Sequence, residues 1–319
     1  MIVVAGNLAD IDTALVYARL ETVGLPYRPI DLSRYPIGYR LRWTWRGGGP
    51  EGWIETDDWR LDLADVSAAY IRLAAPEGHS PASDARPGAG DAISIEGLAT
   101  ILAMIDELPC LVVNRPASGR MSYGSLLRAA AIRAAGLATP STLVTNDAAE
   151  ARRFYDEHGG DVIRLTGGGW STMTPSGDEP LELPPRLGDG PARFQQWIPG
   201  EDVRVHTVGD EVIATRVRSA ATDVRSGSLN GHAPEMEPTA IPPAVAAACL
   251  RLGRSLDLPL AGIDLRETPD GRHFCVGIHP TPDFGYYELQ TGQPITHAIA
   301  DLLDRGTWAA SGSSAYAMA

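Results

Sequence analysis

The sequence predicts an α/β fold made of two or three packed units. Its 319 residues exceed one typical domain of roughly 100–150 residues. Apolar residues make up 44% of the chain and charged residues 21%, which is the balance of an ordinary globular protein. Segments with the period-two alternation of strands alternate with segments that have the apolar spacing of helices. No apolar run approaches the roughly 18 residues that cross a bilayer, so we expect a soluble protein without a membrane partner.

The net charge and the cysteine content limit which partners and which cellular compartment are expected. The formal net charge of −13 argues against nucleic acid, whose partners usually present a basic face. The cysteines lie far apart in apolar segments, which fits reduced core thiols better than disulfides or a zinc site. They are Cys110, Cys249 and Cys275. The apolar start of the chain is too short for a signal peptide and has no basic flank, so we expect a cytoplasmic protein.

The chain contains no lysine, and all 27 basic residues are arginine. Codon bias in a GC-rich genome accounts for this and also fits the many Ala, Gly and Pro residues. The chemical consequence is independent of the cause. Any step that needs an ammonium group must use a guanidinium instead, which is planar, larger and permanently charged.

The first unit, expected over residues 1–115, begins as a parallel α/β unit. Met1–Gly6 reads as a strand, Asp10 as a helix cap and Gly24 as the end of that helix. The loop between them lacks the glycine spacing of a Rossmann dinucleotide site. The other elements expected here are the strands Pro26–Leu32, Leu41–Trp45, Trp53–Thr56, Trp59–Leu63, Ala68–Leu73 and Cys110–Asn114, the helix Ile93–Leu108, a turn over Gly47–Pro50 and a loop over Pro76–Asp91.

A second unit is expected over residues 116–192, a third over 193–305 and a disordered tail over 306–319. The second contains the helices Ser125–Ala135 and Ala148–His158, the strands Ser141–Thr145 and Asp161–Leu165, and a glycine-rich loop after them. The third contains the strands Phe194–Ile198, Asp202–Val208, Glu211–Arg218, Leu260–Glu267 and His273–His279 and the helices Pro242–Leu256 and Pro294–Leu303.

Several motifs in a fixed order resemble those of ATP-grasp peptide ligases. They are Asn114-Arg-Pro116, Ala135–Asn146, Asp202–Asp210, Asp223-Val-Arg225, Ala261-Gly-Ile-Asp264 and Thr291–Ile295. The nearest branch is the one that builds graspetides, the microviridin-type peptides, with RimK-like ligases further off. The resemblance extends from the first residue to about Asp304. It implies an ATP-grasp fold with an N-terminal pre-ATP-grasp α/β domain and a role in the modification of ribosomal peptides.

The resemblance also implies site residues. Members of this family use ATP and magnesium to turn a carboxylate into an acyl phosphate, which an amine or hydroxyl then attacks. On this basis the catalytic residues are Arg204, Asp264 and His279, and Arg225 binds substrate. Asp264 is also the expected metal ligand. The residues expected to bind the cofactor are Arg164, Gly167, Gly168, Gln196 and Ile198.

Four positions depart from the family pattern. Two family lysines match Arg164 and, approximately, Ser125. The Glu-x-Asn-Pro pattern that ligates magnesium reads Gly277-Ile-His279-Pro280 here. Magnesium prefers oxygen ligands, so the loss of a carboxylate and the arrival of an imidazole disfavour it. A zinc site on Asp264 and His279 lacks an evident third ligand.

Two functional interpretations remain open. In the first, a degenerate ATP-grasp protein binds a peptide or small carboxylate through Arg204 and Arg225 and acts as a pseudo-ligase or an ATP-independent peptide-modifying protein, as a homodimer or beside a partner enzyme. In the second, an active ATP-dependent carboxylate–amine or ester-forming ligase has a rebuilt nucleotide site, with Asp283 or Glu288 as the missing magnesium ligand. The alternative to both is a purely structural role for Arg204, Arg225 and Asp264, as ion pairs on sheet strands.

Overall fold

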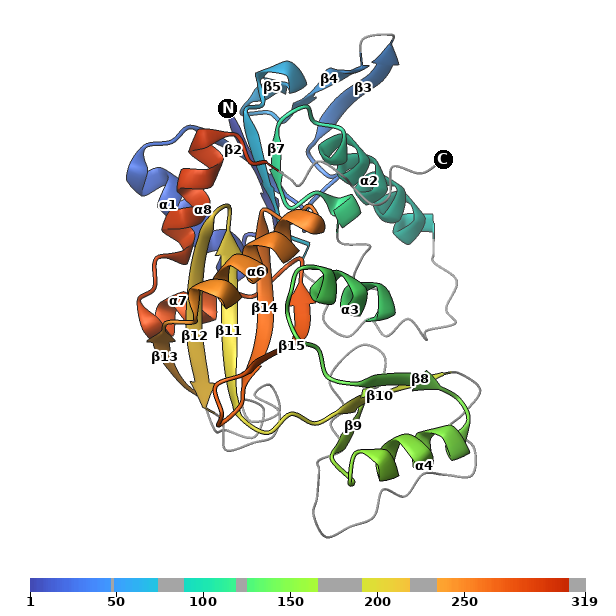
Figure 1. Cartoon of the computed structure of the whole chain (residues 1–319). Helices are drawn as coiled ribbons and strands as arrows, with labels where there is room; N and C mark the ends of the chain where they lie inside the picture. Colours follow the sequence, from blue (N-terminus) through green and yellow to red (C-terminus); the bar gives the residue numbers. More distant parts are fainter. Residues whose placement is uncertain (47–48, 74–88, 119–124, 166–190, 219–233, 310–319) are drawn as a thin grey trace.

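The computed structural model describes residues 1–46, 49–73, 89–118, 125–165, 191–218 and 234–309. In this part of the chain the strands form four sheets, arranged from one end of the molecule to the other (Figure 1). No helix within it is both long and apolar enough to cross a membrane. The mixed α/β architecture confirms the predicted fold class.

The N-terminal sheet is parallel, with the strand order β2-β1-β6-β7. The strands are β1 (Ile2–Gly6), β2 (Tyr27–Asp31), β6 (Ala68–Ile71) and β7 (Leu111–Val113). Helix α1 (Ile11–Val23) begins where the Asp10 carboxylate accepts the backbone N–H of Thr13 at 2.9 Å, and ends at Gly24 with φ 73°. Both ends agree with the sequence prediction. Apolar residues of helix α2 (Ala89–Asp106) pack in one core with residues of β1 and β6.

A small antiparallel sheet, β3-β4-β5, adjoins this unit. Its strands are β3 (Arg40–Arg46), β4 (Gly49–Glu55) and β5 (Arg60–Asp62), followed by the 3-10 helix η1 (Leu63–Asp65). The prediction of a turn through Pro50 was wrong, because β4 already begins at Gly49. Pro50 is tolerated in the strand because it pairs only with Trp45 of β3, while β5 pairs with residues 53–55.

A third sheet is formed by the middle of the sequence and is called the central sheet for that reason. It has the antiparallel order β8-β10-β9. It consists of β8 (Thr142–Thr145), β9 (Val162–Leu165) and β10 (Ala192–Gln196), and α4 (Ala148–Glu157) follows β8 in the chain. Phe194 of β10 is fully buried and packs with Phe154 of α4 in a separate small core. This sheet and α4 lie at the end of the molecule opposite the N-terminal sheet (Figure 1).

The largest sheet has the antiparallel order β13-β12-β11-β14-β15. Its strands are β11 (Glu201–Val208), β12 (Glu211–Arg218), β13 (Glu235–Thr239), β14 (Leu260–Glu267) and β15 (His273–His279). Helices α3 (Ser125–Ala134) and α6 (Pro243–Ser255) cover one face with a shared apolar core. Strand β13 was not predicted, because its two glutamates and Pro238 are poor strand formers. It is an edge strand, where proline is tolerated.

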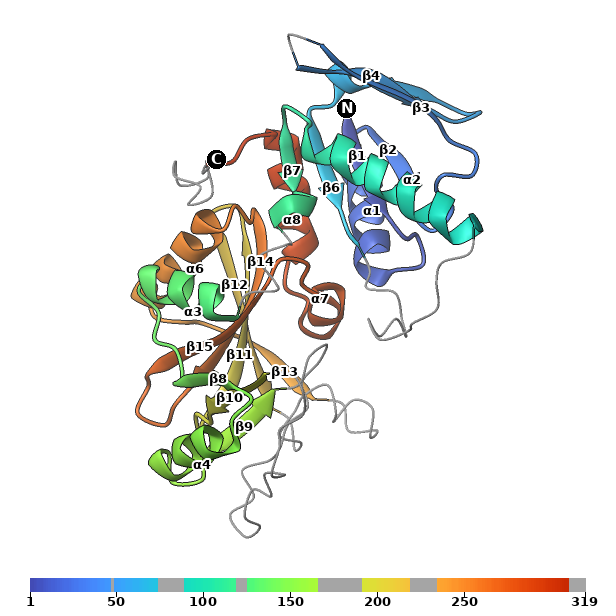
Figure 2. The ribbon, with the colours of Figure 1, turned by 90° about the vertical axis from the view of Figure 1, so that its right-hand side faces the viewer.

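The end of the chain returns to the first unit. Helix α7 (Gly285–Thr291), which was not predicted, and α8 (Ile295–Arg305) lie between the largest sheet and the N-terminal sheet (Figure 2). Their apolar side chains share one core with β1, α1 and β11. Trp308 packs against the same core, so packed structure extends past the predicted start of the disordered tail at Gly306. Residues 310–319 lie outside the described part of the chain.

The cysteines are free thiols, as predicted. Cys110 is half-buried, while Cys249 and Cys275 are buried in the core between α3, α6 and the largest sheet. Burial raises the pKa of the Cys249 thiol to about 12 and also raises the pKa of Cys275. Both thiols therefore remain protonated and act as packing groups.

Candidate functional site

The three predicted catalytic residues meet on one face of the largest sheet. In the strand ladders, Arg204 of β11 lies opposite Asp264 of β14, and Asp264 lies opposite Gly277 of β15. His279 is two residues beyond Gly277, so it belongs to the next row on the same face. Arg204, which precedes Asp264 by 60 positions in the sequence, thus lies in the same group as Asp264 and His279 across three strands.

Asp264 is the centre of this group. Its Oδ1 atom lies 3.1 Å from Arg204 Nε, and its Oδ2 atom accepts a hydrogen bond of 2.6 Å from His279 Nε2. Both carboxylate oxygens are therefore engaged by cationic or proton-donating groups of the protein. A divalent cation at Asp264 would therefore have to displace one of these groups or share an oxygen with it.

Arg204 is a buried cation held by its surroundings. The residue is only 8% exposed, and its guanidinium lies 5.4 Å from the centre of the Tyr287 ring. Burial acts to lower the pKa of Arg204, but the Asp264 carboxylate, Tyr287 and Asp283 together outweigh burial, and the pKa is raised. Gly262 makes space for this group, since a Cβ atom there would lie 2.6 Å from Arg204 Nη1.

Gly277 makes space for the imidazole of His279. A Cβ atom at position 277 would lie 3.2 Å from Asp264 Oδ2 and 3.5 Å from His279 Nε2. A longer side chain would press on the contact between these two groups. The two departures from the magnesium motif, Gly277 and His279, are therefore physically coupled, because the small residue permits the contact that the imidazole makes.

A β-bulge in β15 decides which residues face the site. The pairing shifts between Asp264, which lies opposite Gly277, and Leu265, which lies opposite Cys275. Without the shift, Cys275, Gly277 and His279 would all point to one face. With it, Cys275 enters the core on the other face.

His206 belongs to the same face and was missed by the sequence reasoning. It lies two residues after Arg204, so period two along β11 would have indicated it. The side chain is fully buried, and its Nε2 atom lies 3.2 Å from the backbone carbonyl oxygen of Asp283. Its ring contacts Tyr287 edge-on at 5.0 Å. Burial and the charge of Arg204 lower the pKa of His206 to about 3, so the imidazole is neutral.

This lowered pKa predicts a pH dependence of stability. Below the ordinary pKa of about 6.5, the unfolded chain binds a proton at His206 that the folded chain does not bind. His206 should therefore lower the free energy of unfolding by up to about 1.4 kcal/mol per pH unit as the pH falls from 6.5 to 5. Urea unfolding at pH 7 and pH 5 measures it. His206→Gln should remove this slope and the exposed His297→Gln should keep it, so equal slopes in the wild type and His206→Gln would contradict the assignment.

Arg72 ties the site to the N-terminal unit. At the end of β6, its guanidinium lies 2.8 Å from Asp10, 2.6 Å from Asp12 and 2.7 Å from Asp283. Asp12 also accepts the backbone N–H of Phe284 at 2.8 Å. Burial raises the pKa of Asp12 despite the charge of Arg72. The network fixes Asp283 and Phe284, which directly precede α7. The backbone carbonyl oxygen of Asp283 is the one that His206 contacts.

The predicted cofactor residues fall into two groups. Gln196 is half-buried on β10, and the buried Ile198 accepts a hydrogen bond of 3.0 Å from Arg266 at its carbonyl oxygen. The backbone of Arg164 on β9 pairs with Phe194 on β10. Gly167, Gly168 and Arg225 lie outside the described residues, so their predicted roles stay predictions.

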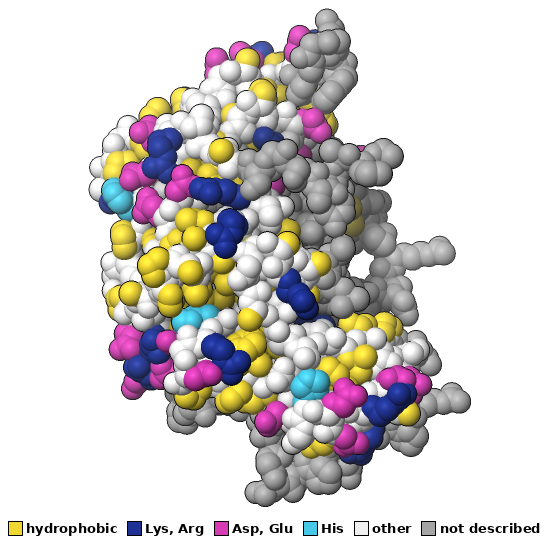
Figure 3. Space-filling view, viewed as in Figure 1, with side chains coloured by type: hydrophobic (Ala, Val, Ile, Leu, Met, Phe, Trp, Pro, Cys, Tyr) yellow, Lys and Arg dark blue, Asp and Glu magenta, His cyan; other side chains and the backbone are white. Residues whose placement is uncertain are grey.

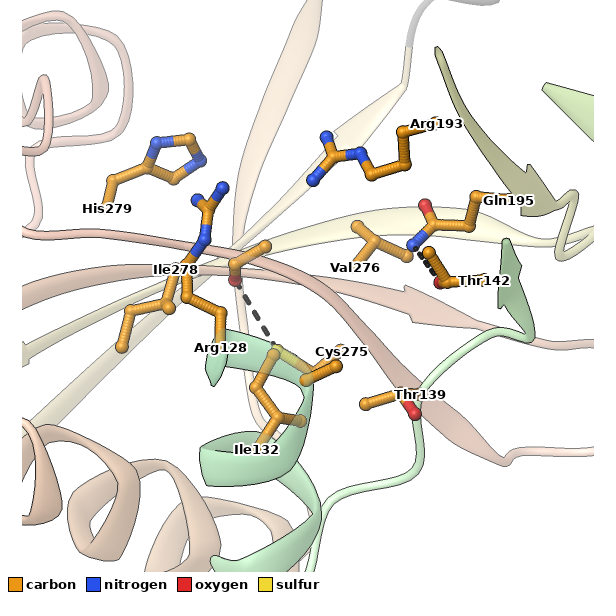
Figure 4. Close-up of a pocket in the computed structure, with 12 residues that line it drawn as sticks. Arg128, Ile132, Thr139, Thr142, Arg193, Gln195, Cys275, Val276, Ile278 and His279 are labelled. Carbon is orange, nitrogen blue, oxygen red and sulfur yellow. Dashed lines mark hydrogen bonds between the residues drawn. The ribbon is translucent and has the colours of Figure 1, made fainter. Parts of the chain in front are cut away.

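A pocket opens between the central sheet and β15, beside the Asp264 group (Figure 4). It contains two arginines that the sequence reasoning missed, Arg128 of α3 and Arg193 of β10. His279 forms part of its wall. The other lining residues are Ala129, Ile132, Thr139, Thr142, Gln195, Cys275, Val276, Gly277 and Ile278. Gln195 Nε2 donates a hydrogen bond of 3.3 Å to Thr142 Oγ1 on the floor of this pocket.

The described residues do not fit a standard magnesium site. Among them, no group of three or more His, Cys, Asp or Glu side chains is placed to hold a metal ion. Glu288, a suggested replacement ligand, accepts the backbone N–H of Thr296 at 2.7 Å at the start of α8. Asp283, the other suggestion, pairs with Arg72. Both carboxylates thus already contact groups of the protein.

Solved structures similar to this chain include a macrocyclase and ATP-grasp ligases. No protein-family model matches the sequence, and no curated protein matches it. The macrocyclase MdnC from Microcystis aeruginosa MRC, bound with precursor peptide MdnA, is 22% identical with a TM-score of 0.74, over 96% of this chain and 100% of that one. A RiPP-associated ATP-grasp ligase from Chryseobacterium gregarium, in complex with ADP and a leader and core peptide, is 22% identical with a TM-score of 0.76, over 96% and 97%. The D-alanine–D-alanine ligase of Bacillus anthracis is 13% identical with a TM-score of 0.56, over 96% and 95%.

The similarity extends over nearly the whole of each chain, so it concerns the complete arrangement of sheets and not one motif. At these identities it establishes the fold. The order of the motifs in the sequence predicts the same fold, independently of the coordinates. The chain therefore has the ATP-grasp fold.

Proposed function

We propose that this chain binds a ribosomally made precursor peptide, or a small carboxylate, and takes part in its modification without magnesium-dependent ligation. The observation that carries the proposal is the state of Asp264, whose two oxygens are engaged by Arg204 and His279. The peptide assignment is supported by the resemblance of the motifs and by similar solved structures that contain precursor peptides. ATP-grasp ligation requires cations on the phosphates, which this arrangement disfavours.

The same group offers chemistry of its own. An imidazole oriented by a carboxylate is the arrangement that lets the other ring nitrogen accept or donate a proton. His279 has that partner in Asp264 and also forms part of the pocket wall. A bound peptide hydroxyl or amine near His279 could lose its proton to the ring. Arg204 lies beside the same carboxylate and supplies its positive counter-charge.

The test is isothermal titration of ATP with and without magnesium, followed by an assay for ADP release in the presence of peptide. We expect magnesium to leave the affinity for ATP unchanged, because Asp264 is not available to the metal. Asp264→Asn, which keeps the shape of the side chain, serves as the matched variant. Binding that requires magnesium, is lost in Asp264→Asn and leads to peptide-dependent ADP release would instead establish the active ligase.

The peptide part of the proposal needs a separate measurement. Fluorescence anisotropy with labelled synthetic precursor peptides, including MdnA from the similar macrocyclase structure, would detect binding directly. Saturable binding, competed by unlabelled peptide, is the expected result. If none of these peptides binds, the peptide assignment fails, whatever the outcome with ATP.

A further inference from the structure

Two arginines from different elements face the same pocket. Arg128 projects from α3 and Arg193 from β10, which belongs to the central sheet. Figure 4 shows both guanidinium groups and the imidazole of His279 turned toward one space. On β10, Phe194 packs into the small core with α4, so period-two alternation brings its neighbour Arg193 to the pocket side.

These two arginines differ from several other arginines in the described part of the chain. Arg72, Arg204 and Arg216 each have carboxylate oxygens within 4 Å. On the face shown in Figure 3, acidic and basic side chains interleave over α4. Arg128 and Arg193 make no ion pair and no hydrogen bond with any residue that the structure describes, and the described lining of the pocket includes no Asp or Glu.

Within the described residues, nothing balances the positive charge of the pair. Both side chains are half-buried. Burial lowers the pKa of Arg128, and burial together with the charge of Arg128 lowers the pKa of Arg193. Two like charges that share a partly desolvated space repel each other, and an anion between them would relieve the repulsion. The planar forks of arginine suit the oxygens of a phosphate group in particular.

We propose that Arg128 and Arg193 form a metal-independent binding site for a phosphate-bearing anion. The two arginines would supply the positive charge for which ligases of this fold use a metal ion. Thr142 and Gln195 offer polar groups and Ile132 and Ile278 apolar walls beside the charges, which suits a nucleotide better than a bare anion. This inference rests on the proposed absence of magnesium-dependent ligation and names the ligand class of the same pocket.

The experiment is calorimetric titration of the full chain with ADP and with pyrophosphate, each in EDTA and in excess magnesium. We expect both anions to bind in EDTA and magnesium to give no gain in affinity. Arg128→Gln and Arg193→Gln should each weaken binding roughly tenfold to a hundredfold, which is the effect of losing a charged hydrogen bond. Arg133→Gln removes the same charge from an exposed position of the same helix and should bind like the wild type.

Each outcome has a definite meaning. Loss of affinity in the two pocket variants, with Arg133→Gln unchanged, supports the site, and tighter binding of ADP than of pyrophosphate identifies a nucleotide as the source of the phosphate. Binding only with magnesium contradicts this inference and the proposed function together. No binding with or without magnesium contradicts this inference alone. Circular dichroism of each variant shows that a lost affinity is not a lost fold.

Discussion

Replacement of Asp264 by alanine is expected to lower the free energy of unfolding by about 3 kcal/mol or more, because it leaves a buried cation uncompensated. Arg204 is 8% exposed, and its Nε atom lies 3.1 Å from Asp264. Without the carboxylate, the guanidinium keeps its desolvation cost and loses its principal counter-charge. The charge of Arg204 cannot be removed by deprotonation at neutral pH, since its pKa is raised in the folded protein.

Urea unfolding at neutral pH measures this effect. The control is Asp210→Ala at the turn after β11, where the pair with Arg254 at 2.5 Å is largely exposed and the expected loss is about 1 kcal/mol or less. His279→Ala should also cost less than Asp264→Ala, since it removes a hydrogen-bond partner of Asp264 and not the counter-charge of Arg204. Equal losses in Asp264→Ala and Asp210→Ala would show that the carboxylate of Asp264 has no special structural role.

The second large effect is expected from restoring the magnesium motif. The double variant Gly277→Glu with His279→Asn brings back the Glu-x-Asn-Pro pattern that this part of the chain resembles. It frees Asp264 Oδ2 from the imidazole and adds a carboxylate and an amide oxygen in the same rows of the sheet. Because magnesium prefers such oxygens, we expect it to strengthen ATP binding by at least about tenfold in the variant but not in the wild type.

Single variants separate the two contributions. His279→Asn alone frees Asp264 without supplying the second carboxylate, so its magnesium dependence should be weak. Gly277→Glu alone places a side chain against the contact of His279 with Asp264, where even a Cβ atom would lie 3.2 Å from Oδ2. It should therefore lower stability without a gain in metal binding. A double variant that folds and still shows no response to magnesium would mean that these two positions are not what separates the chain from a ligase.

Much of the architecture could be predicted from local patterns. Period two located β11, β14 and β15 to within a residue or so, and an aspartate and a glycine fixed both ends of α1. The unpredicted elements, β13 and α7, have weak local signals. Strand β13 contains a proline and two glutamates, and α7 has only seven residues. Packing against β12 and against the shared core with α1 makes them regular.

The site shows the same division between local and distant information. Arg204, Asp264 and His279 could be named from motif order, and the structure places them in contact. Arg128 and Arg193 could not, because an arginine on a helix and another on a strand have no local feature that marks them as neighbours. The bulge beside Asp264 is equally invisible, since it depends on how β15 pairs with β14.

The sequence by itself determined the α/β class, the order and approximate bounds of most elements, the free cysteines and the group of Arg204, Asp264 and His279. These follow from hydrophobic periodicity, capping residues and motif order, all of which are local in the chain. Only the tertiary structure decided that both oxygens of Asp264 are engaged, that His206 is buried and neutral, and that Arg128 and Arg193 share a pocket. The physical reason is that ion pairing, desolvation and like-charge proximity depend on distances between segments, which strand pairing and helix packing set after the local structure has formed.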